Sequence, residues 1–397
     1  MKLARWTDSL SRSALEEMLV RTASPDVLSL ALGLPAPELF PREGIEAALA
    51  SRLTSDPRAL QYGPPLTELR AFVSQLMARR GVRCRPEQIF LTAGAQQGMS
   101  LLTRLLIEPG ATVAIESLCY SGFTQCLAPL SARAVVAPLD AAAGVDLDAL
   151  EALFAHERPA LFYTQSDGHN PLGTSLSPAA RERLVALARA HRVPILEDDA
   201  YGFLQYEDDP HPALRALDEE WVIYLGSFSK TLAPALRTGW LVVPEAWIAP
   251  LSSLKESSDI NCAPLGQRAI ESFVATGGFD PHLARLRAAY RERRDALLAA
   301  IERHFPADAH WSSPRAGFFV WVELDSSIDT TELLRVALEE EKVAFVPGGA
   351  FATAGSGAGA HALRLNLSLN PPALLEEGVA RIARALERQK HDTRRSR

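Results

Sequence analysis

Residues 225–240 read LGSFSKTLAPALRTGW, and they place a single lysine, Lys230, directly after an apolar, strand-like run. Small and apolar residues surround this lysine, and Arg237 is the next cation along the chain. A lysine in such surroundings is seldom buried unless it is paired or neutral. Burial and a nearby cation both lower the pKa of a lysine, which favours a nucleophilic amine that can form a Schiff base. The same stretch also fits a lysine whose ammonium group reaches out to solvent.

Motifs of other enzyme classes match parts of the chain but lack positions that those classes require. A nucleotide-binding P-loop needs a glycine before its lysine, where this chain has Ser229. Ser227 and Lys230 have the S-x-x-K spacing of penicillin-binding enzymes, but the other elements of that class are replaced by SDG at 166–168 and KTL at 230–232. The segment 355–360 formally matches a dinucleotide fingerprint, but its Gly-, Ala- and Ser-rich surroundings predict a loop.

Short apolar runs alternate with helical patterns through the middle of the chain. The strand candidates are Thr112–Glu116, Ala134–Ala137, Ala160–Thr164, Val193–Leu196, Trp221–Leu225 and Gly239–Val243. They are continuous apolar runs, as is typical of parallel strands that are covered on both faces. Helical segments lie between them, such as Ser177–His191, in which Pro178 suits the first turn. The alternation predicts an α/β fold with a mostly parallel sheet and a ligand site beyond the carboxyl ends of its strands.

After about residue 278 the pattern changes to that of a smaller α+β domain. Its predicted helices and strands are Asp280–Phe305, Gly317–Glu323, Thr330–Glu341, Val343–Val346, Leu363–Leu367 and Pro372–Gln389. We place the boundary at the glycine pair 277–278, which gives a large domain over 42–280 and a small domain over 281–397. The basic tail, 390–397, is expected to fray.

The charge balance and the composition exclude several classes of function. With 41 Lys and Arg against 48 Asp and Glu, the net charge is −7, and no basic block is available to neutralise nucleic-acid phosphates. Hydrophobic residues make up 47% of the chain, too many for a disordered protein. The sequence contains no run of about 20 apolar residues, the length that is needed to span a membrane. Its cysteines lack the spacing of a metal site or a disulfide framework, and its first residues lack a signal-peptide pattern. We therefore expect a cytoplasmic protein without a metal site and without a nucleic-acid or membrane partner.

Several separated motifs, in order along nearly the whole chain, resemble the fold-type-I pyridoxal-phosphate enzymes, specifically the class I/II aminotransferases. The nearest matches are LSLALGLPAPELFP at 28–41 and SFSKTLAPALRTGW at 227–240, which are most similar to the 2-aminoadipate and kynurenine aminotransferase branch. The resemblance implies a three-layer large domain that binds pyridoxal 5'-phosphate. It also implies that the segment 1–41 covers the active site and completes the small domain. The expected activity is transfer of an amino group between an amino acid and a 2-oxo acid, by a homodimer whose sites lie at the subunit interface.

The resemblance assigns the central chemistry to four residues. Lys230 would form the Schiff base and then act as the acid and base that moves the substrate proton. Asp198 matches the carboxylate that keeps the pyridine nitrogen protonated, and the spacing to Tyr201 distinguishes it from the adjacent Asp199. Tyr201 and Asn170 match the pair that hydrogen-bonds the phenolic oxygen of the cofactor.

The cofactor's phosphate is expected at the start of the helix that follows the predicted strand 88–92. Free backbone N–H groups of Ala95 and Gln96 would bind it there, helped by the helix dipole. Ser227 and Arg237 would add a hydroxyl and a guanidinium group. Ala95 stands where related sequences commonly have a hydroxyl residue, so weaker rather than abolished phosphate binding is expected.

Further matches concern the ring, the substrate and the neighbouring subunit. Tyr120 resembles the aromatic residue that stacks on the pyridine ring. Arg364 matches the arginine that binds the substrate α-carboxylate through a bidentate fork, with Asn170 and the backbone at Gly33 beside it. Tyr62 resembles the tyrosine that reaches the phosphate of the neighbouring subunit, although the loop after it is about two residues shorter than usual for the family.

Substrate choice and reaction type are less constrained by the sequence. Relatives that accept acidic substrates often carry an arginine in the N-terminal helix, where this chain has Glu16. This favours a neutral or basic amino donor, unless Glu16 is simply a solvated helix residue. The same cofactor also supports β-lyases and acyl-condensing synthases. A non-catalytic transcription regulator is the alternative from another class, and only about 40 residues precede the main fold, with no basic helix-turn-helix pattern among them.

Overall fold

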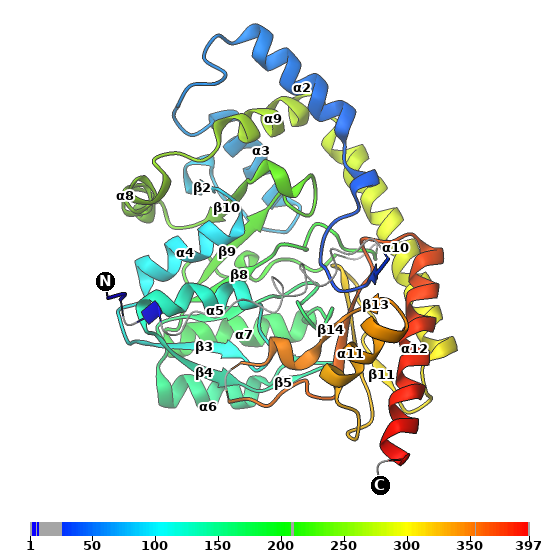
Figure 1. The fold of residues 1–397 in the computed structure, drawn as a ribbon. Coiled ribbons are helices and arrows are strands. Elements are labelled where there is room, and N and C mark those ends of the chain that lie inside the picture. Colours follow the sequence, from blue (N-terminus) through cyan, green and yellow to red (C-terminus); the bar gives the residue numbers. More distant parts are fainter. Residues whose placement is uncertain (1, 5, 8–25, 208–209, 354, 396–397) are drawn as a thin grey trace.

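A seven-stranded sheet forms the centre of the larger part of the computed structural model, which describes residues 2–4, 6–7, 26–207, 210–353 and 355–395 (Figure 1). The strand order is β2-β10-β9-β8-β7-β3-β4. Strand β10 runs antiparallel to both of its neighbours, and the other pairings are parallel. The strands are β2 (Ile89–Thr92), β3 (Thr112–Glu116), β4 (Arg133–Ala137), β7 (Phe162–Thr164), β8 (Ile195–Asp198), β9 (Val222–Ser227) and β10 (Gly239–Val242). The predicted α/β fold with a mostly parallel sheet is confirmed.

Helices cover both faces of this sheet because its strands are apolar on both sides. In β3, for example, Val113 and Ile115 belong to one apolar cluster and Ala114 to another. The first cluster includes residues of α4 (Ala95–Leu106), α5 (Ser121–Leu127) and α8 (Ile248–Asp259), and the second includes residues of α6 (Leu147–Glu157) and α7 (Pro178–His191). These are the outer layers of a three-layer arrangement.

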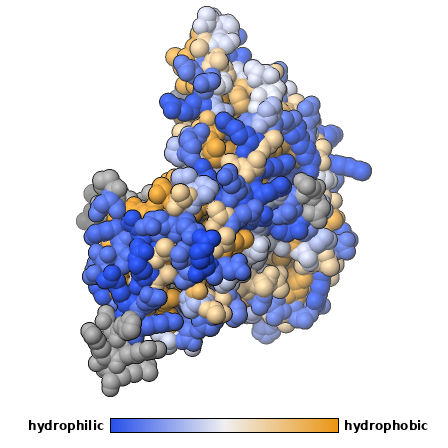
Figure 2. Space-filling model, turned by 90° about the vertical axis from the view of Figure 1, so that its right-hand side faces the viewer, coloured by the Kyte–Doolittle hydropathy of each residue, from blue (hydrophilic) through white to orange (hydrophobic). Residues whose placement is uncertain are grey.

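A second sheet, with the order β11-β12-β15-β14, belongs to the C-terminal part of the chain. Its strands are β11 (His310–Trp311), β12 (Phe319–Glu323), β14 (Val346–Pro347) and β15 (Ala362–Asn366), and the helices of this part are α10 (Phe279–His304), α11 (Thr330–Glu340) and α12 (Pro372–Arg395). Helices α10 and α12 lie side by side (Figure 1), and hydrophilic residues cover most of the face on that side of the molecule (Figure 2).

The N-terminal segment is tied to this second unit. Strand β1 (Leu28–Ser29) pairs in parallel with β13 (Val343–Ala344). Beyond the strand, the Leu30 N–H donates to the carbonyl of Ala344, and the carbonyl of Leu30 accepts from the N–H of Asn366, each at 2.7 Å. Residues that are far apart in the sequence therefore share one small α+β unit.

The end of the chain differs from the prediction. Helix α12 continues to Arg395, whereas the sequence pattern indicated a helix that ends at Gln389 and a frayed tail from Lys390. Neither glycine nor proline occurs between Val379 and Arg395, so the sequence contains no residue that would break the helix. The apolar stripe ends near Leu386, which explains why hydrophobic periodicity stops before the helix does.

Helices α2 (Arg42–Ser55) and α9 (Pro264–Ala275) pack together at the top of the molecule, beside α3 (Thr67–Ala78) (Figure 1). A short hairpin, β5 (Leu139–Asp140) and β6 (Gly144–Val145), lies beyond β4. Between α9 and α10 the chain turns at Gly277, whose φ of 76° favours glycine. The division into domains at this turn stays a prediction. Within the described ranges, no helix combines the length and the apolar character needed to cross a bilayer.

Candidate active site

A pocket lies where the chain leaves the carboxyl ends of the parallel strands β7, β8 and β9, as expected for an open α/β sheet. Of the residues predicted from the sequence, the pocket is lined by Gly33, Ala95, Gln96, Tyr120, Asn170, Asp198, Tyr201, Ser227, Lys230, Arg237 and Arg364. Tyr62 is not among the described lining residues, and its side chain is 68% exposed. Glu16 lies outside the described residues.

The amine of Lys230 points into the protein rather than out to solvent. Its Nζ donates a hydrogen bond to the carbonyl of Gly33 at 2.8 Å and lies 5.9 Å from the ring centre of Phe318. Burial, and after it the positive charge of Arg364, lowers the pKa of Lys230 to about 8. At this pKa roughly a tenth of the amine is neutral and nucleophilic at pH 7, compared with well under a hundredth at the ordinary lysine pKa of about 10.4.

Asp198 is the last residue of strand β8, and only one of its two carboxylate oxygens accepts hydrogen bonds from described residues. Its Oδ2 accepts hydrogen bonds from the Tyr163 hydroxyl at 2.7 Å and from Gln165 Nε2 at 3.1 Å. Its Oδ1 is buried and has no hydrogen-bond partner among the described residues. Burial raises the pKa of Asp198 to about 6, and the bond from Tyr163 opposes that rise. An unsatisfied buried acceptor of this kind is costly unless a donor fills the pocket.

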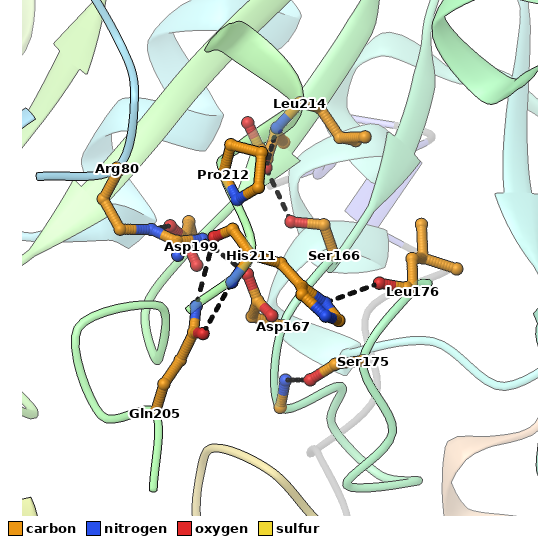
Figure 3. Close-up of polar contacts among 12 residues, drawn as sticks. Arg80, Ser166, Asp167, Ser175, Leu176, Asp199, Gln205, His211, Pro212 and Leu214 are labelled. Carbon is orange, nitrogen blue, oxygen red and sulfur yellow. Dashed lines mark hydrogen bonds and ion pairs between the residues drawn. The ribbon is translucent and has the colours of Figure 1, made fainter. Parts of the chain in front are cut away.

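The adjacent Asp199 lies in different surroundings, outside the residues that line the pocket (Figure 3). Its Oδ2 accepts from Arg80 Nε at 3.1 Å and from the Tyr224 hydroxyl at 2.9 Å. Arg80 also pairs with Asp167 at 2.5 Å. Side chains alternate between the faces of a strand, so successive carboxylates at the end of β8 enter separate environments. This geometry favours Asp198 over Asp199 as a ligand contact.

Arg364 is a buried cation without a carboxylate partner among the described residues. Its Nη1 donates to Asn170 Oδ1 at 2.6 Å and its Nη2 to the carbonyl of Ala31 at 2.5 Å, while Nε has no partner. The guanidinium carbon lies 4.1 Å from the ring centre of Phe319 and 4.6 Å from that of Phe351. Burial lowers the pKa of Arg364 to about 9, which still leaves it protonated at neutral pH. A desolvated guanidinium held between two rings is a site for a carboxylate.

The start of helix α4 forms an anion-binding corner. The N-cap residue Gly94 has a φ of 84°, and the first N–H groups of the helix, at Ala95 and Gln96, have no partner within the helix. A Cβ at Gly94 would lie 2.5 Å from Arg237 Nη2, so glycine is needed for the guanidinium to approach. Ser227 Oγ accepts from the N–H of Ser229 at 3.1 Å, which leaves its own proton available to donate. The side chain of Gln96 is already bonded to the carbonyl of Gly122, so only its backbone is available.

The tyrosines of the pocket are neutral hydrogen-bonding groups. Burial raises the pKa of Tyr120 to about 12, and it raises that of Tyr201 further. The ring of Tyr201 packs edge-on against Phe318 and Phe319, which fixes its orientation. Tyr120 precedes α5 and lines the pocket beside Ser121.

The sequence analysis missed several residues of the site. Tyr163 and Gln165, which hold Asp198, were not singled out, nor were Phe319 and Phe351, which bracket Arg364. The first pair has a detectable signal, since Tyr163 and Gln165 are hydrogen-bonding residues at alternate positions where an apolar run ends. The two phenylalanines have no such signal, because apolar residues in a predicted core are common.

The arrangement fits one kind of ligand. A flat aromatic ring with a protonated nitrogen would satisfy Asp198 Oδ1, and an aldehyde on it could react with Lys230. A phosphate substituent would suit the start of α4, and a carboxylate-bearing second molecule would suit Arg364. Within the part of the chain that the structure describes, no cluster of His, Cys, Asp or Glu is placed to hold a metal ion.

Comparisons with known proteins agree with this geometry. The family model described as aminotransferase class I and II matches residues 26–382. The chain is 36% identical over 401 residues to a 2-aminoadipate transaminase from Thermus thermophilus, covering 98% of each chain. It superposes on the alpha-aminoadipate aminotransferase LysN from Thermus thermophilus, complexed with N-(5'-phosphopyridoxyl)-L-leucine, with a TM-score of 0.89 at 35% identity over 97% of each chain. A kynurenine aminotransferase from Pyrococcus horikoshii, in complex with PMP, gives a TM-score of 0.91 at 31% identity over 98% of this chain and 97% of that one.

The lowered pKa of Lys230 predicts how its reactivity depends on pH. In the ligand-free protein, labelling of Lys230 by an amine-directed reagent should rise with pH through a midpoint of about 8, because only the neutral amine reacts. In Arg364→Leu the midpoint should move upward, since the repelling cation is gone. Mass spectrometry of the labelled peptide gives both midpoints. A wild-type midpoint near the ordinary lysine value of about 10.4 would contradict the prediction.

Proposed function

The chain belongs to the class I and II aminotransferases, and we propose that Lys230 is the amine that holds its cofactor and that Arg364 binds its amino-acid substrate. The chain is a pyridoxal-phosphate-dependent transaminase, a conclusion supported by the family model and by the named relatives and structures. The residue assignments depend on one observation: within the described residues, a single pocket holds a lysine of lowered pKa, an Asp198 oxygen without a hydrogen-bond partner and an Arg364 without a carboxylate partner.

The residues of the pocket would each contact a different group of pyridoxal phosphate. Asp198 Oδ1 would accept from the ring nitrogen, Tyr120 would lie against the ring, and Tyr201 with Asn170 would face its phenolic oxygen. The phosphate would lie at the backbone N–H groups of Ala95 and Gln96, with the Ser227 hydroxyl and Arg237. When bound, this cofactor supplies an electron sink that acidifies the α-carbon of the amino acid.

The chain's own residues would orient the substrate and move its proton. Arg364 would bind the α-carboxylate by two parallel hydrogen bonds from N–H groups that its bonds to Asn170 and to the carbonyl of Ala31 leave available. The Lys230 amine, with a pKa of about 8, is suited to accept the proton from the substrate α-carbon and to return it later. Lys230 is already directed inward by the carbonyl of Gly33, so little reorganisation is needed.

We further propose that the amino donor has a neutral side chain. The part of the pocket near Arg364 is lined by apolar residues that include Leu34, Val346 and Phe351. Among the described lining residues the cations are Lys230, Arg237 and Arg364, and each already has a role in the proposal. A second carboxylate would therefore be desolvated without a partner there, which is costly.

The enzyme is also proposed to act as a homodimer. Exposed apolar side chains gather around the loop before α3 and the turn before α9, with Leu60 78%, Tyr62 68% and Ile260 69% exposed. The two segments touch, because Asn261 Nδ2 donates to the carbonyl of Gly63 at 2.7 Å. An exposed apolar cluster of this kind is typical of a protein interface. Tyr62 on this surface would reach the phosphate of the neighbouring subunit. A cytoplasmic location stays a prediction.

Lys230→Ala tests the central assignment. We expect a loss of about 10²- to 10⁴-fold in transamination rate, the range that a positioned acid and base contributes. Borohydride treatment of the wild type with pyridoxal phosphate should attach the cofactor to the peptide that contains residue 230. Lys342→Asn, at an exposed lysine with a positive φ, is the matched control. Full turnover by Lys230→Ala would refute the assignment, and conversion of the cofactor to its amine form by a donor alone distinguishes transamination from β-lyase or synthase chemistry.

A donor panel tests the proposed substrate class. Initial rates with leucine should exceed those with 2-aminoadipate by about tenfold or more, because the second carboxylate finds no partner cation. Leu34→Arg adds a cation beside the pocket, at a side chain that is 41% exposed, and should shift the preference toward 2-aminoadipate. A clear wild-type preference for the dicarboxylate would exclude the neutral-donor proposal. Lysine as a third donor shows whether a basic side chain is accepted.

The dimer proposal is tested by Leu60→Glu, which places a charge on the exposed apolar surface. Sedimentation should show a dimer that dissociates at about tenfold higher concentration or more, with activity falling in parallel. Leu374→Glu, at a side chain that is 43% exposed on α12, is the control and should leave the association unchanged. Sedimentation of the wild type as a monomer of 43.1 kDa at all concentrations would contradict the dimer.

A further inference from the structure

Gln165 occupies the loop directly after β7, and both ends of its side-chain amide are used. Its Nε2 donates to Asp198 Oδ2 at 3.1 Å, and its Oε1 accepts from the backbone N–H of Asn170 at 2.9 Å. The side chain is buried, with 5% exposed. The reversed amide would turn an oxygen toward a carboxylate and an NH₂ toward an N–H donor, so these partners fix its orientation.

The hydrogen bonds of Gln165 continue beyond Asn170. The side-chain Oδ1 of Asn170 accepts from Arg364 Nη1 at 2.6 Å, and Arg364 Nη2 reaches the carbonyl of Ala31 at 2.5 Å. A chain of contacts therefore runs from Asp198, at the ring end of the pocket, to Arg364, at the carboxylate end. Gln165 is the side chain that joins its two halves.

The residues that follow Gln165 are held by buried hydrogen bonds and ion pairs. Ser166 Oγ donates to Glu197 Oε1 at 2.6 Å, which ties it to the residue before Asp198. Asp167 pairs with Arg80 at 2.5 Å and with Arg181 at 2.7 Å, and the Arg80 side of this network is drawn in Figure 3. Buried and fully paired networks of this kind limit local motion. Gln165 therefore has a rigid base from which to hold both of its partners.

We propose that Gln165 is a positioning residue that couples the two ends of the active site, so that it holds Asp198 for the cofactor ring and Asn170 with Arg364 for the substrate carboxylate. The proposal rests on the proposed function of these residues. Because Arg364 would bind the carboxylate through the same guanidinium that Asn170 contacts, Gln165 lies on the path of hydrogen bonds between that carboxylate and Asp198. Coupling of this kind acts equally in both directions.

Tyr163 provides a matched control for this role. Its hydroxyl donates to the same oxygen, Asp198 Oδ2, at 2.7 Å, and its ring stacks on Phe123. Its hydroxyl has no hydrogen bond to the Asn170 and Arg364 half of the chain among the described contacts. Tyr163→Phe therefore removes a donor to Asp198 alone, whereas Gln165→Leu removes a donor to Asp198 and an acceptor for Asn170.

Two dissociation constants separate these effects: that of pyridoxal phosphate for the cofactor-free protein, and that of 4-methylpentanoate for the loaded enzyme. Tyr163→Phe should weaken the first about tenfold and leave the second within about twofold of wild type. Gln165→Leu should weaken both about tenfold. Gln165→Glu keeps the acceptor for Asn170 but sets a carboxylate against Asp198. It should therefore restore 4-methylpentanoate binding while cofactor binding stays weak, a split that general damage to the pocket would not produce.

The possible outcomes are distinct. If Gln165→Leu weakens only cofactor binding, as Tyr163→Phe does, Gln165 serves Asp198 alone and the coupling proposal is wrong. The proposal is equally wrong if Gln165→Glu loses 4-methylpentanoate binding as fully as Gln165→Leu. Should Gln165→Leu fail to fold, as judged by circular dichroism, Gln165→Glu against Tyr163→Phe still decides the question. Failure of the wild type to bind either probe would instead refute the proposed function.

Discussion

The constraint on which the pocket depends is a guanidinium group that is kept out of water and has no carboxylate to neutralise it within the described part of the chain. Arg364 is held by Asn170, by a backbone carbonyl and by two aromatic rings, which are weaker partners than an anion would be. Burial is the main cause of the lowered pKa of Lys230, and the positive charge of Arg364 lowers it further. One desolvated cation therefore creates a place for an anion and also helps to keep the nearby amine nucleophilic.

Two adjacent carboxylates at the end of β8 lie in different environments because successive side chains of a strand point to opposite faces. Among the described residues each of these carboxylates has one oxygen without a hydrogen-bond partner, but Asp198 lines the pocket, whereas Asp199 lies outside it and is bound by Arg80 and Tyr224. Because the network around Arg80 fixes both Asp199 and Asp167, the loops that carry Asp198 and Asn170 start from rigid points. The residues that are proposed to contact the ligand are thus held in place by an ionic cluster that does not line the pocket.

The sheet could be predicted from the sequence because continuous apolar runs mark its strands, and Lys230 stood out as a lone cation after one of them. Asp198 and Arg364 were predicted because the motifs around them resemble those of the class I/II aminotransferases. Gln165 could not be recognised from the sequence, because its role depends on hydrogen-bond partners elsewhere in the chain. The length of α12 escaped prediction for another reason, since a polar helix extension has no apolar stripe to mark it.

The pairing of β1 with β13 has a consequence for folding during synthesis of the chain. Leu28 lies near the beginning and pairs with Val343 near the end, and Ala31 in the same segment accepts a bond from Arg364. The part of the pocket around Arg364 therefore cannot form in a nascent polypeptide while β13 and β15 are still inside the ribosome. During synthesis the strands of the large sheet can therefore be complete while the pocket still lacks the contacts that β13 and β15 make with the N-terminal segment.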